Sequence, residues 1–503
     1  MNEMEKLIRD WSQSNGFDRV LNIEGIPLWW FYRRYFTSHV MPGRINPFKF
    51  MEKNIPLSIK DKAKYSLNAK LLEKYLNFNE NRKIRYFKPK NEYSAEEKIL
   101  FLTYTNHLID GELFRFQRMI DKLKRDGKYK DLVLFADPLS SSGYKRLAGR
   151  STFYEYYDDN ISIQAKFDAE LWFKQWKMID EKIKREIFMI NGKSLWPYLK
   201  YPFSFYFSEE FFYFLSLYYR ISKKIIEQEN IKAIVVSSQS GFFEKCMLAA
   251  ALKKNIQVFQ IQHGMGSGML ENTYATKRLV FSEFHKQELI GSGVSEEDII
   301  ITGPIVFDEI ADFKSAGKEK NILIAASPYV EGNVISKEEY FSKINMLVDA
   351  LKDFKVIIKL HPREKHFNDY PSKVKVLKDI SRKEFYQLIS ECSVFINFGS
   401  TAAFEAIIMD KPVITIDIAG IMNSPLKEVV CTLLFDSQAS INLDRMDGIK
   451  EIIVKAIDDV ELALERKKFV EKYCYKLDGK ASERGVEAIY DLIGNLNSSN
   501  HYN

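Results

Sequence analysis

The fold is decided by four apolar segments in the C-terminal half: Asn321-Ile-Leu-Ile-Ala-Ala326, Lys355-Val-Ile-Ile-Lys-Leu360, Ser393-Val-Phe-Ile-Asn397 and Pro412-Val-Ile-Thr-Ile-Asp417. Each segment is short, rich in β-branched residues and bounded by polar residues or turn formers, which is typical of a buried strand. Helical patterns separate most of them, at residues 336–352, 382–391 and 400–409, and another follows at 446–471. This alternation predicts a parallel sheet with helices on both faces.

The same alternation occurs earlier in the chain. Strand-like segments lie at 98–104, 131–136, 231–237 and 256–262, with a helix expected over Phe242–Lys253. Two consecutive series predict an α/β protein with two doubly wound domains that face each other. We assign the segments at 277–281 and 298–302 to the second series and place the hinge near 264–276, where three glycines cluster: Gly264, Gly266 and Gly268.

These patterns divide the chain into four regions. Residues 1–95 are expected to be helical, basic and aromatic. Residues 96–268 form the first α/β domain with a mainly helical insertion at about 150–230. Residues 269–490 form the second α/β domain, and 491–503 are a loose tail.

Composition narrows the class of protein. The 503 residues are 46% hydrophobic and 28% charged, which excludes a disordered, collagen-like or coiled-coil chain. Four widely spaced cysteines argue against a zinc ribbon or a disulfide framework and fit a reducing cytoplasm. No apolar run approaches the roughly 18 residues that span a bilayer, so we expect a soluble protein or one on a membrane surface.

Positive charge is concentrated in the N-terminal fifth. Residues 1–95 carry 18 Lys and Arg against 10 Asp and Glu, whereas the whole chain has a net charge of +6. This region includes Trp29-Trp30-Phe31-Tyr32-Arg33-Arg34. Aromatic residues beside arginines suit an anionic membrane surface, although a solvated basic face over a buried aromatic stripe explains them equally simply. The modest excess and the lack of a recognition motif argue against nucleic-acid binding.

Polar residues after the predicted strands mark the candidate site, because ligands of open parallel sheets bind beyond the carboxyl ends of the strands. Gln262-His263-Gly264 follow one strand. His263 could act as a general base or bind a phosphoryl oxygen, or it could be held by backbone near a hinge. His361-Pro362-Arg363 follow another strand, and the Arg363 guanidinium suits phosphate or carboxylate unless it is simply at the surface.

The turn after Asn397 is the most specific local pattern. Gly399 permits a tight turn, and Ser400 and Thr401 are suitable N-cap residues. The exposed amides of the helix start predict a diphosphate site. Glu405, one helical turn beyond Thr401, could bind ribose hydroxyls in the same cleft, or it could face solvent on an ordinary capped helix.

The loop at residues 105–111 offers a second candidate base. Either His107 or Asp110 could deprotonate an acceptor hydroxyl. A helix N-cap role for Asp110 is an equal alternative.

Together these residues resemble the GT-B superfamily. The matching segments are Gln262-His263-Gly264, Ile301-Thr302-Gly303-Pro304, Phe307-Asp308, Lys359-Leu360-His361-Pro362, Gly399-Ser400-Thr401, Glu405-Ala406 and Lys411-Pro412-Val413-Ile414. The segment from Asp478 to Arg484 is similar to the end of its surface-polymer branches. These branches are capsule and polysialic-type glycosyltransferases, CDP-glycerol glycerophosphotransferases and, more distantly, UDP-N-acetylglucosamine 2-epimerases.

The resemblance implies a nucleotide-sugar donor on the C-terminal domain and a glycan or lipid-linked acceptor on the N-terminal one. His361, Arg363 and the 399–401 turn would hold donor phosphates, and Glu405 would bind the ribose. His263 would line the cleft. Asp110 partly matches the acidic-acidic-glycine motif of polysialic-type enzymes, with Ile109 in the first acidic position. The remaining substrate-binding candidates are His107, Gly264, Gly303 and Pro304.

We therefore expect an inverting glycosyltransferase of surface polysaccharide or glycolipid assembly, without metal or cofactor, at the inner face of the cell membrane. Asp110 or His263 would be its base. Gln262 and Ile396-Asn397 stand where glycerophosphotransferases usually carry Trp and a Ser-Asp pair, and Asn397 stands where many retaining enzymes carry Glu. One alternative is alditol-phosphate transfer from a CDP-alditol with His263 as base. Another is a non-catalytic scaffold that binds sugar nucleotides or polymer.

Overall fold

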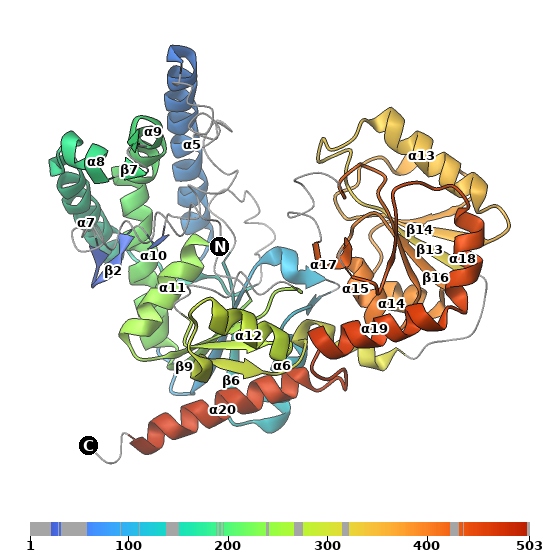
Figure 1. The fold of residues 1–503 in the computed structure, drawn as a ribbon. Helices are drawn as coiled ribbons and strands as arrows, with labels where there is room; N and C mark the ends of the chain where they lie inside the picture. The colour runs from blue at the N-terminus through green and yellow to red at the C-terminus, as the bar shows by residue number, and fades with distance from the viewer. Residues whose placement is uncertain are drawn as a thin grey trace.

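The protein consists of two α/β domains and a helical region that covers the first of them (Figure 1). The structure is a computed structural model that describes residues 22–28, 30–31, 58–90, 92–109, 111–136, 150–187, 189–190, 193–194, 196–237, 241–265, 275–313, 321–422, 432–435 and 437–499. Each domain buries its own apolar side chains around its sheet.

The first sheet has six parallel strands in the order β12-β11-β10-β9-β3-β6. Their bounds are Lys98–Thr103 (β3), Lys130–Phe135 (β6), Ile231–Val236 (β9), Gln257–Ile261 (β10), Lys277–Val280 (β11) and Ile299–Ile301 (β12). The central strands are buried on both faces, which explains why they are continuous apolar runs. The helices after these strands are α6 (Gln117–Asp126), α11 (Phe242–Lys253) and α12 (Glu283–Gly291).

The second sheet also has six parallel strands, in the order β15-β14-β13-β16-β17-β18. Their bounds are Asn321–Ala325 (β13), Lys355–Lys359 (β14), Lys375–Leu377 (β15), Val394–Asn397 (β16), Val413–Ile416 (β17) and Ile441–Leu443 (β18). The helices of this domain are α13 (Lys337–Ala350), α14 (Arg382–Glu391), α15 (Ala402–Ile408), α17 (Thr432–Phe435), α18 (Ile449–Ile457) and α19 (Val460–Tyr473). The four segments that predicted this sheet are all strands in it.

Three expectations about these domains are wrong. The segments at 277–281 and 298–302 belong to the first sheet, because β11 pairs with β10 and β12 pairs with β11. The chain crosses to the second domain only after the 3-10 helix Ile305–Asp312, well beyond the glycine cluster. The helix expected at 446–471 is two helices, because the Asp459 carboxylate accepts the amide of Leu462 at 3.0 Å and starts a new N-terminus there.

The chain returns to the first domain at its C-terminal end. Helix α20 (Ala481–Ser499) packs against α6 and the first sheet. Asp308 accepts hydrogen bonds from the amides of Ala481 and Ser482, at 2.9 and 2.6 Å, and thereby caps α20. The tail predicted at 491–503 is therefore wrong as far as Ser499, since the helix continues and Ile493 is buried. Residues 500–503 lie outside the described residues.

Among the described residues of the N-terminal region and the insertion, most belong to helices; residues 1–21 and 32–57 lie outside the described residues. The helices are α5 (Ile59–Tyr86), the 3-10 helix Phe153–Tyr156, α7 (Asp159–Met178), α8 (Glu181–Ile187), α9 (Trp196–Tyr206) and α10 (Glu209–Gln228). Within the described ranges, three short hairpins have strands of two residues each: β1–β2 (Asn22–Ile23, Ile26–Pro27), β4–β5 (Leu108–Ile109, Glu112–Leu113) and β7–β8 (Met189–Ile190, Lys193–Ser194). Among the described helices, none is both long and apolar enough to cross a bilayer.

The aromatic segment beside the arginines is partly buried. Trp30 is 6% exposed, and the Lys245 ammonium donates to the carbonyl oxygens of Trp30 and Phe31 at 3.2 and 3.0 Å. Trp30 is thus packed inside the first domain and not available to a membrane. Trp29 and residues 32–36 lie outside the described residues.

Candidate active site

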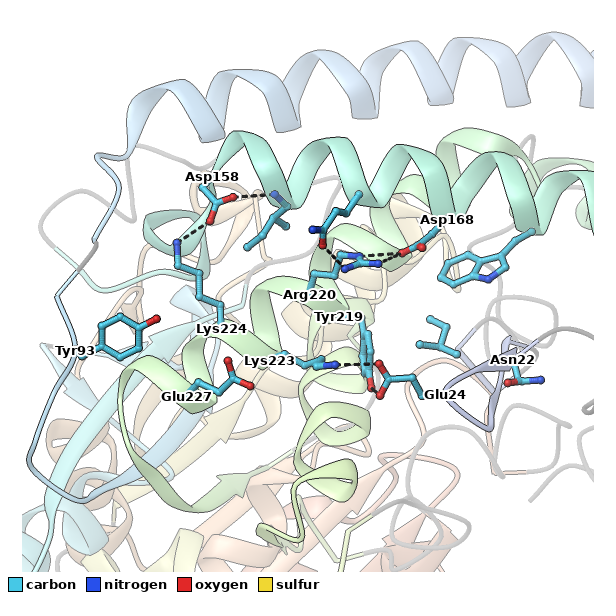
Figure 2. Close-up of a pocket in the computed structure, with 14 residues that line it drawn as sticks. Asn22, Glu24, Tyr93, Asp158, Asp168, Tyr219, Arg220, Lys223, Lys224 and Glu227 are labelled. Atoms are coloured by element: carbon cyan, nitrogen blue, oxygen red, sulfur yellow. Dashed lines mark hydrogen bonds and ion pairs between the residues drawn. The ribbon is translucent and has the colours of Figure 1, made fainter.

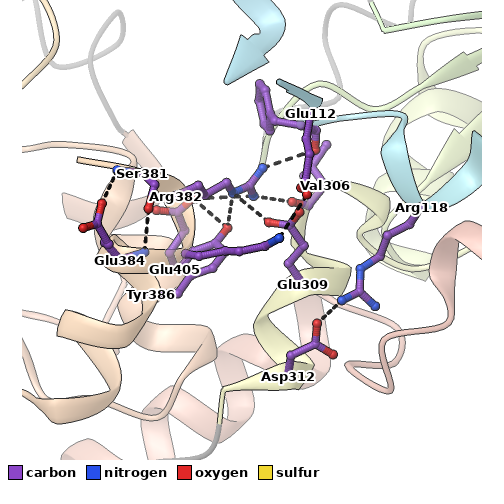
Figure 3. A network of polar contacts seen from close by, with 12 residues as sticks. Glu112, Arg118, Val306, Glu309, Asp312, Ser381, Arg382, Glu384, Tyr386 and Glu405 are labelled. Atoms are coloured by element: carbon purple, nitrogen blue, oxygen red, sulfur yellow. Dashed lines mark hydrogen bonds and ion pairs between the residues drawn. The ribbon is translucent and has the colours of Figure 1, made fainter. Parts of the chain in front are cut away.

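The predicted site residues follow the carboxyl ends of strands in both sheets. His107 follows β3 and His263 follows β10 in the first domain, whereas His361 follows β14 and the turn at 398–401 follows β16 in the second. Arg382, the first residue of α14, joins the two sides. Its guanidinium donates to the carbonyl oxygen of Phe114 at 3.3 Å and to that of Val306 (Figure 3).

His263 is in contact with an arginine that sequence reasoning did not single out. The Nη2 of Arg115 lies 2.8 Å from His263 Nε2, and His263 Nδ1 lies 3.3 Å from the carbonyl oxygen of Ser237. The Arg115 guanidinium also contacts Nδ1 of the same ring, so both ring nitrogens of His263 face a cation. Neither nitrogen is open to an acceptor hydroxyl while Arg115 stays in this position.

Arg115 itself is buried and incompletely paired. Its side chain is 9% exposed, and its Nε has no hydrogen-bond partner. Burial, together with the charge of Arg382, lowers the pKa of Arg115 to about 9. The guanidiniums of Arg115 and Arg382 lie 4.7 and 4.6 Å from the centre of the Phe114 ring. Two cations from different domains therefore meet at one aromatic side chain. Arg382 also lies 3.6 Å from the Glu309 carboxylate, so Arg115 is the cation of the two that is left to meet an anionic ligand.

His107 lies behind His263. The ring centres are 6.4 Å apart, and His107 Nδ1 is 3.2 Å from the Thr103 hydroxyl. Burial and the nearby Arg115 lower the pKa of His107 to about 3, so this imidazole is neutral at physiological pH. His107 can accept or donate one hydrogen bond but adds no charge to the cleft.

Glu405 points toward the cationic group that joins the domains. Its Oε1 lies 3.9 Å from Nη2 of Arg382 and 3.4 Å from the Tyr386 hydroxyl (Figure 3). Burial raises the pKa of Glu405, although the charges of Arg382 and Lys359 act against that rise. The structure thus places Glu405 in an ion-paired network and not on a solvent-facing helix surface.

The turn before α15 is held by a side chain. Asn397 Oδ1 accepts the amides of Gly399 and Ser400 at 2.8 and 3.1 Å, and the Ser400 hydroxyl accepts the amide of Ala402 at 3.3 Å. Gly399 has a φ of +84°, which a glycine adopts without strain. The amides of Gly399 and Ser400, which we expected to be open to phosphate, are satisfied within the turn, while Thr401 is exposed.

The turn after β14 is stabilised by the histidine that it presents. His361 Nδ1 accepts the amide of Arg363 at 3.1 Å, which leaves Nε2 as its remaining polar atom. Burial and the charges of Arg363 and Lys359 lower the pKa of His361 to about 4. Arg363 is exposed. A neutral imidazole and an exposed guanidinium on one turn can both donate hydrogen bonds to phosphate.

The remaining predicted residues are less central. Gly264 is held by Gln262, whose amide donates to its carbonyl oxygen at 2.7 Å. Gly303 and Pro304 lie in the crossing between the domains, where a side chain at Gly303 would come within 3.0 Å of Arg484. Asp110, the other predicted base, lies outside the described residues.

A separate cavity of about 490 Å³ lies in the helical part of the first domain (Figure 2). Helix α10 supplies three cations, which pair with Asp168, Glu24 and Asp158 at 2.8–2.9 Å. None of the predicted site residues lines this cavity, so the candidate site remains at the carboxyl edges of the two sheets.

Two facing domains with parallel sheets constitute a GT-B-like fold. Residues 321–491, about a third of the chain, match the family model described as CDP-Glycerol:Poly(glycerophosphate) glycerophosphotransferase. This region is therefore similar to that transferase family, one of the relatives that the sequence suggested. No curated protein matches the chain.

Several solved structures are similar to the chain at low identity. They include UDP-GlcNAc 2-epimerase from Neisseria meningitidis bound to UDP-GlcNAc, with 13% identity, TM-score 0.47 and coverage of 78% of this chain and 100% of that one. The enzyme from Methanocaldococcus jannaschii has 16% identity, TM-score 0.46 and coverage of 78% and 99%. The wall teichoic acid polymerase TagF has 12% identity, TM-score 0.44 and coverage of 88% and 99%. Values of this size carry no argument about function.

Proposed function

We propose that the protein transfers an alditol phosphate, in the first instance glycerol phosphate from CDP-glycerol, to a hydroxyl group of a surface polymer. The match of residues 321–491 to the glycerophosphotransferase family carries this proposal. It favours the alternative in the sequence analysis over sugar transfer, the main expectation there.

The position of Asn397 supports the change of preference. Its amino-acid type departs from the Ser-Asp pair usual in glycerophosphotransferases and was one reason to favour sugar transfer. Asn397 Oδ1 nevertheless accepts the two amides of the following turn, as an aspartate oxygen could. The departure therefore preserves a turn-forming function and does not argue against the family.

The proposed reaction is an attack at phosphorus. The acceptor hydroxyl oxygen bonds to the phosphorus that carries glycerol, and the bond from that phosphorus to the oxygen bridging the two phosphoryl groups breaks. CMP leaves with the bridging oxygen, and a phosphodiester forms. His263 Nε2 takes the hydroxyl proton.

Arg115 would move between two partners during this reaction. In the structure it faces His263 Nε2, so that nitrogen is not yet open to a hydroxyl. A donor phosphate is a stronger partner for a guanidinium than a neutral imidazole. Donor binding would thus draw Arg115 onto the phosphate and expose the base, and Arg115 and Arg382 would then stabilise the charge of the departing CMP.

The second domain would hold the nucleotide. His361 and Arg363 would bind donor phosphates, Ser400 and Thr401 would contribute hydroxyl groups, and Glu405 would contact the ribose while it orients Arg382. The acceptor would approach from the first domain. The polymer acceptor also places the protein at the cytoplasmic face of the membrane in our proposal.

A nucleotide-product assay tests the function. The protein is incubated with one donor per reaction, either CDP-glycerol or one of a panel of UDP, GDP, CMP and dTDP sugars. Each reaction is run with and without a glycerol phosphate oligomer as acceptor. We expect that CDP-glycerol is the one donor of this panel that releases its nucleotide, as CMP, when the acceptor is present. Acceptor-dependent release of a nucleotide from one of the sugar donors instead would contradict the proposal.

Variants test the site. We expect Glu405→Ala and His361→Ala to lower kcat/KM for the donor by roughly tenfold or more, as for lost hydrogen bonds to charged groups. If both variants kept the wild-type kcat/KM, the assignment of the donor site would be wrong. Thermal unfolding with and without CDP would show whether an inactive variant still binds nucleotide.

A further inference from the structure

Helix α5 carries a stripe of exposed apolar side chains. The exposed fractions are 61% for Leu67, 57% for Leu71, 45% for Tyr75 and 59% for Phe78. Spacings of four, four and three residues place these side chains on one face of the helix. Figure 1 shows α5 extending beyond the body of the first domain. A contiguous exposed apolar stripe of this kind marks an interaction surface.

The opposite face anchors α5 to the protein. Glu80 is buried and accepts the hydroxyl of Tyr154 at 3.0 Å and that of Tyr218, and it pairs with Lys83 at 2.7 Å. Leu76 is also buried. Because this face is fixed by a buried polar network, the exposed stripe has a defined orientation relative to the domain.

The charges near the stripe have one sign. Lys70, Lys74, Arg82 and Arg85 are exposed, and their helical positions fall on or beside the apolar face. Only two residues between Leu67 and Tyr86 are acidic. Glu80 is buried on the anchored face, and Glu73 is directed to Glu210 and Ser208.

We propose that this face of α5, from Leu67 to Arg85, docks on an anionic membrane surface. Apolar side chains would enter the boundary between headgroups and acyl chains, while lysine and arginine stems reach back to the phosphates. The charge of the face selects this partner, because an anionic bilayer complements clustered cations with no acidic side chain among them. The proposal stands independently of the reaction at the active site.

Helix α7 shows why charge matters to the choice. It also exposes apolar residues at helical spacing, with 66% of Ile163, 68% of Phe167 and 45% of Leu171 accessible. An exposed acidic residue, Glu170, lies on the same side of that helix. The α7 stripe therefore lacks the single-sign surroundings of the α5 face and does not enter the proposal.

Vesicle co-sedimentation of the full chain tests the proposal. We expect binding to vesicles of phosphatidylglycerol with phosphatidylcholine, weakened by salt, and little binding to phosphatidylcholine alone. Leu71→Ser with Phe78→Ser, and separately Lys70→Glu with Lys74→Glu, should each weaken binding by about tenfold or more.

Matched controls lie in the second domain. Met346→Ser with Val460→Ser alters apolar residues that are 60% and 82% exposed, and Lys352→Glu with Lys467→Glu reverses exposed charges. Both should bind like wild type. Circular dichroism and thermal unfolding will establish that the α5 variants fold, and their turnover of CDP-glycerol with a soluble acceptor should be unchanged.

Three results would overturn the proposal: no wild-type binding to anionic vesicles, equal losses in the α5 and control variants, or a dimer that the α5 substitutions dissociate while vesicle binding is absent. The last result would identify the face as a contact between copies of this chain. Failure of CDP-glycerol turnover by wild type would instead refute the proposed function and leave the docking result standing.

Discussion

The carboxyl edges of the two sheets present different kinds of chemistry. At the first edge, side chains face one another: His263 contacts Arg115, and His107 lies behind them. At the second edge, side chains organise backbone: Asn397 holds the turn before α15, and His361 accepts an amide of its own turn. In our proposal this difference assigns the base to the first domain and donor binding to the second, with Arg382 in contact with both.

The largest expected effect comes from replacing, one at a time, the two histidines at the carboxyl edge of the first sheet. We expect His263→Asn to lower kcat by about 10²–10⁴-fold, the range for loss of a general base. Nucleotide affinity should remain near wild type, because our proposal places the nucleotide on the second domain. His107→Asn should cost less, since His107 is buried behind the proposed base. Equal losses in steady-state kinetics would contradict the division of roles.

The role of Arg382, which contacts both domains, can be tested against that of its neighbour Lys383. Arg382 is buried and bonds to the Phe114 carbonyl oxygen, whereas Lys383 pairs at the surface with Glu112 at 3.0 Å. Arg382→Ala should lower kcat/KM for CDP-glycerol by roughly tenfold to a hundredfold, because it leaves buried partners uncompensated. Lys383→Ala should have little effect. If the two variants behaved alike, Arg382 would only hold the domains together.

Substitution of Asn397 tests whether its side chain holds the turn before α15 at the edge of the second sheet. Asn397→Ala leaves two amides of a buried turn without their acceptor and should lower the free energy of unfolding by roughly 2 kcal/mol. Asn397→Asp keeps an acceptor oxygen and should bind CDP better than the alanine variant. Urea unfolding and calorimetric titration measure the two effects. Unchanged stability in the alanine variant would show that the turn holds without Asn397.

The smallest expected effect concerns a carboxyl group beneath the second edge. Glu364 is 1% exposed, and burial, with nearby Glu331, raises its pKa to about 7. The unfolded chain loses the corresponding proton near about pH 4.3, so the folded protein loses stability as pH rises from about 4.3 to about 7 and no further above that.

Glu364→Gln removes this titration. Below about pH 4 the variant and wild type should have similar stability, whereas above about pH 7 the variant should be more stable, because it has no buried carboxyl group to ionise. Thermal unfolding across this range measures the difference. A stability difference that does not change with pH would refute a raised pKa for Glu364.

Much of the fold could be predicted because buried parallel strands are continuous apolar runs. The segments at 321–326, 355–360, 393–397 and 412–417 are all strands of the second sheet. Alternation alone does not say which sheet an edge strand joins, and β11 and β12 were therefore assigned to the wrong domain. That assignment depends on pairing between β10 and β11, which local sequence does not encode.

The candidate site was only partly predictable. Position after a strand predicted His263, His361 and the turn at 399–401 as candidates, since strand ends lie at one edge of this kind of sheet. Arg115 and Arg382 were missed, because one follows a loop and the other begins a helix on the opposite domain. Their meeting at Phe114 depends on the approach of the domains, and no spacing in the sequence indicates it.

Phosphorus NMR of the acceptor product tests the central claim most directly. The protein is incubated with CDP-glycerol and a glycerol phosphate oligomer, beside His263→Asn as a control. We predict a growing phosphodiester signal in step with CMP release for wild type, and neither for the variant. A nucleotide sugar that yields a glycosidic product, with CDP-glycerol left intact, would contradict the account.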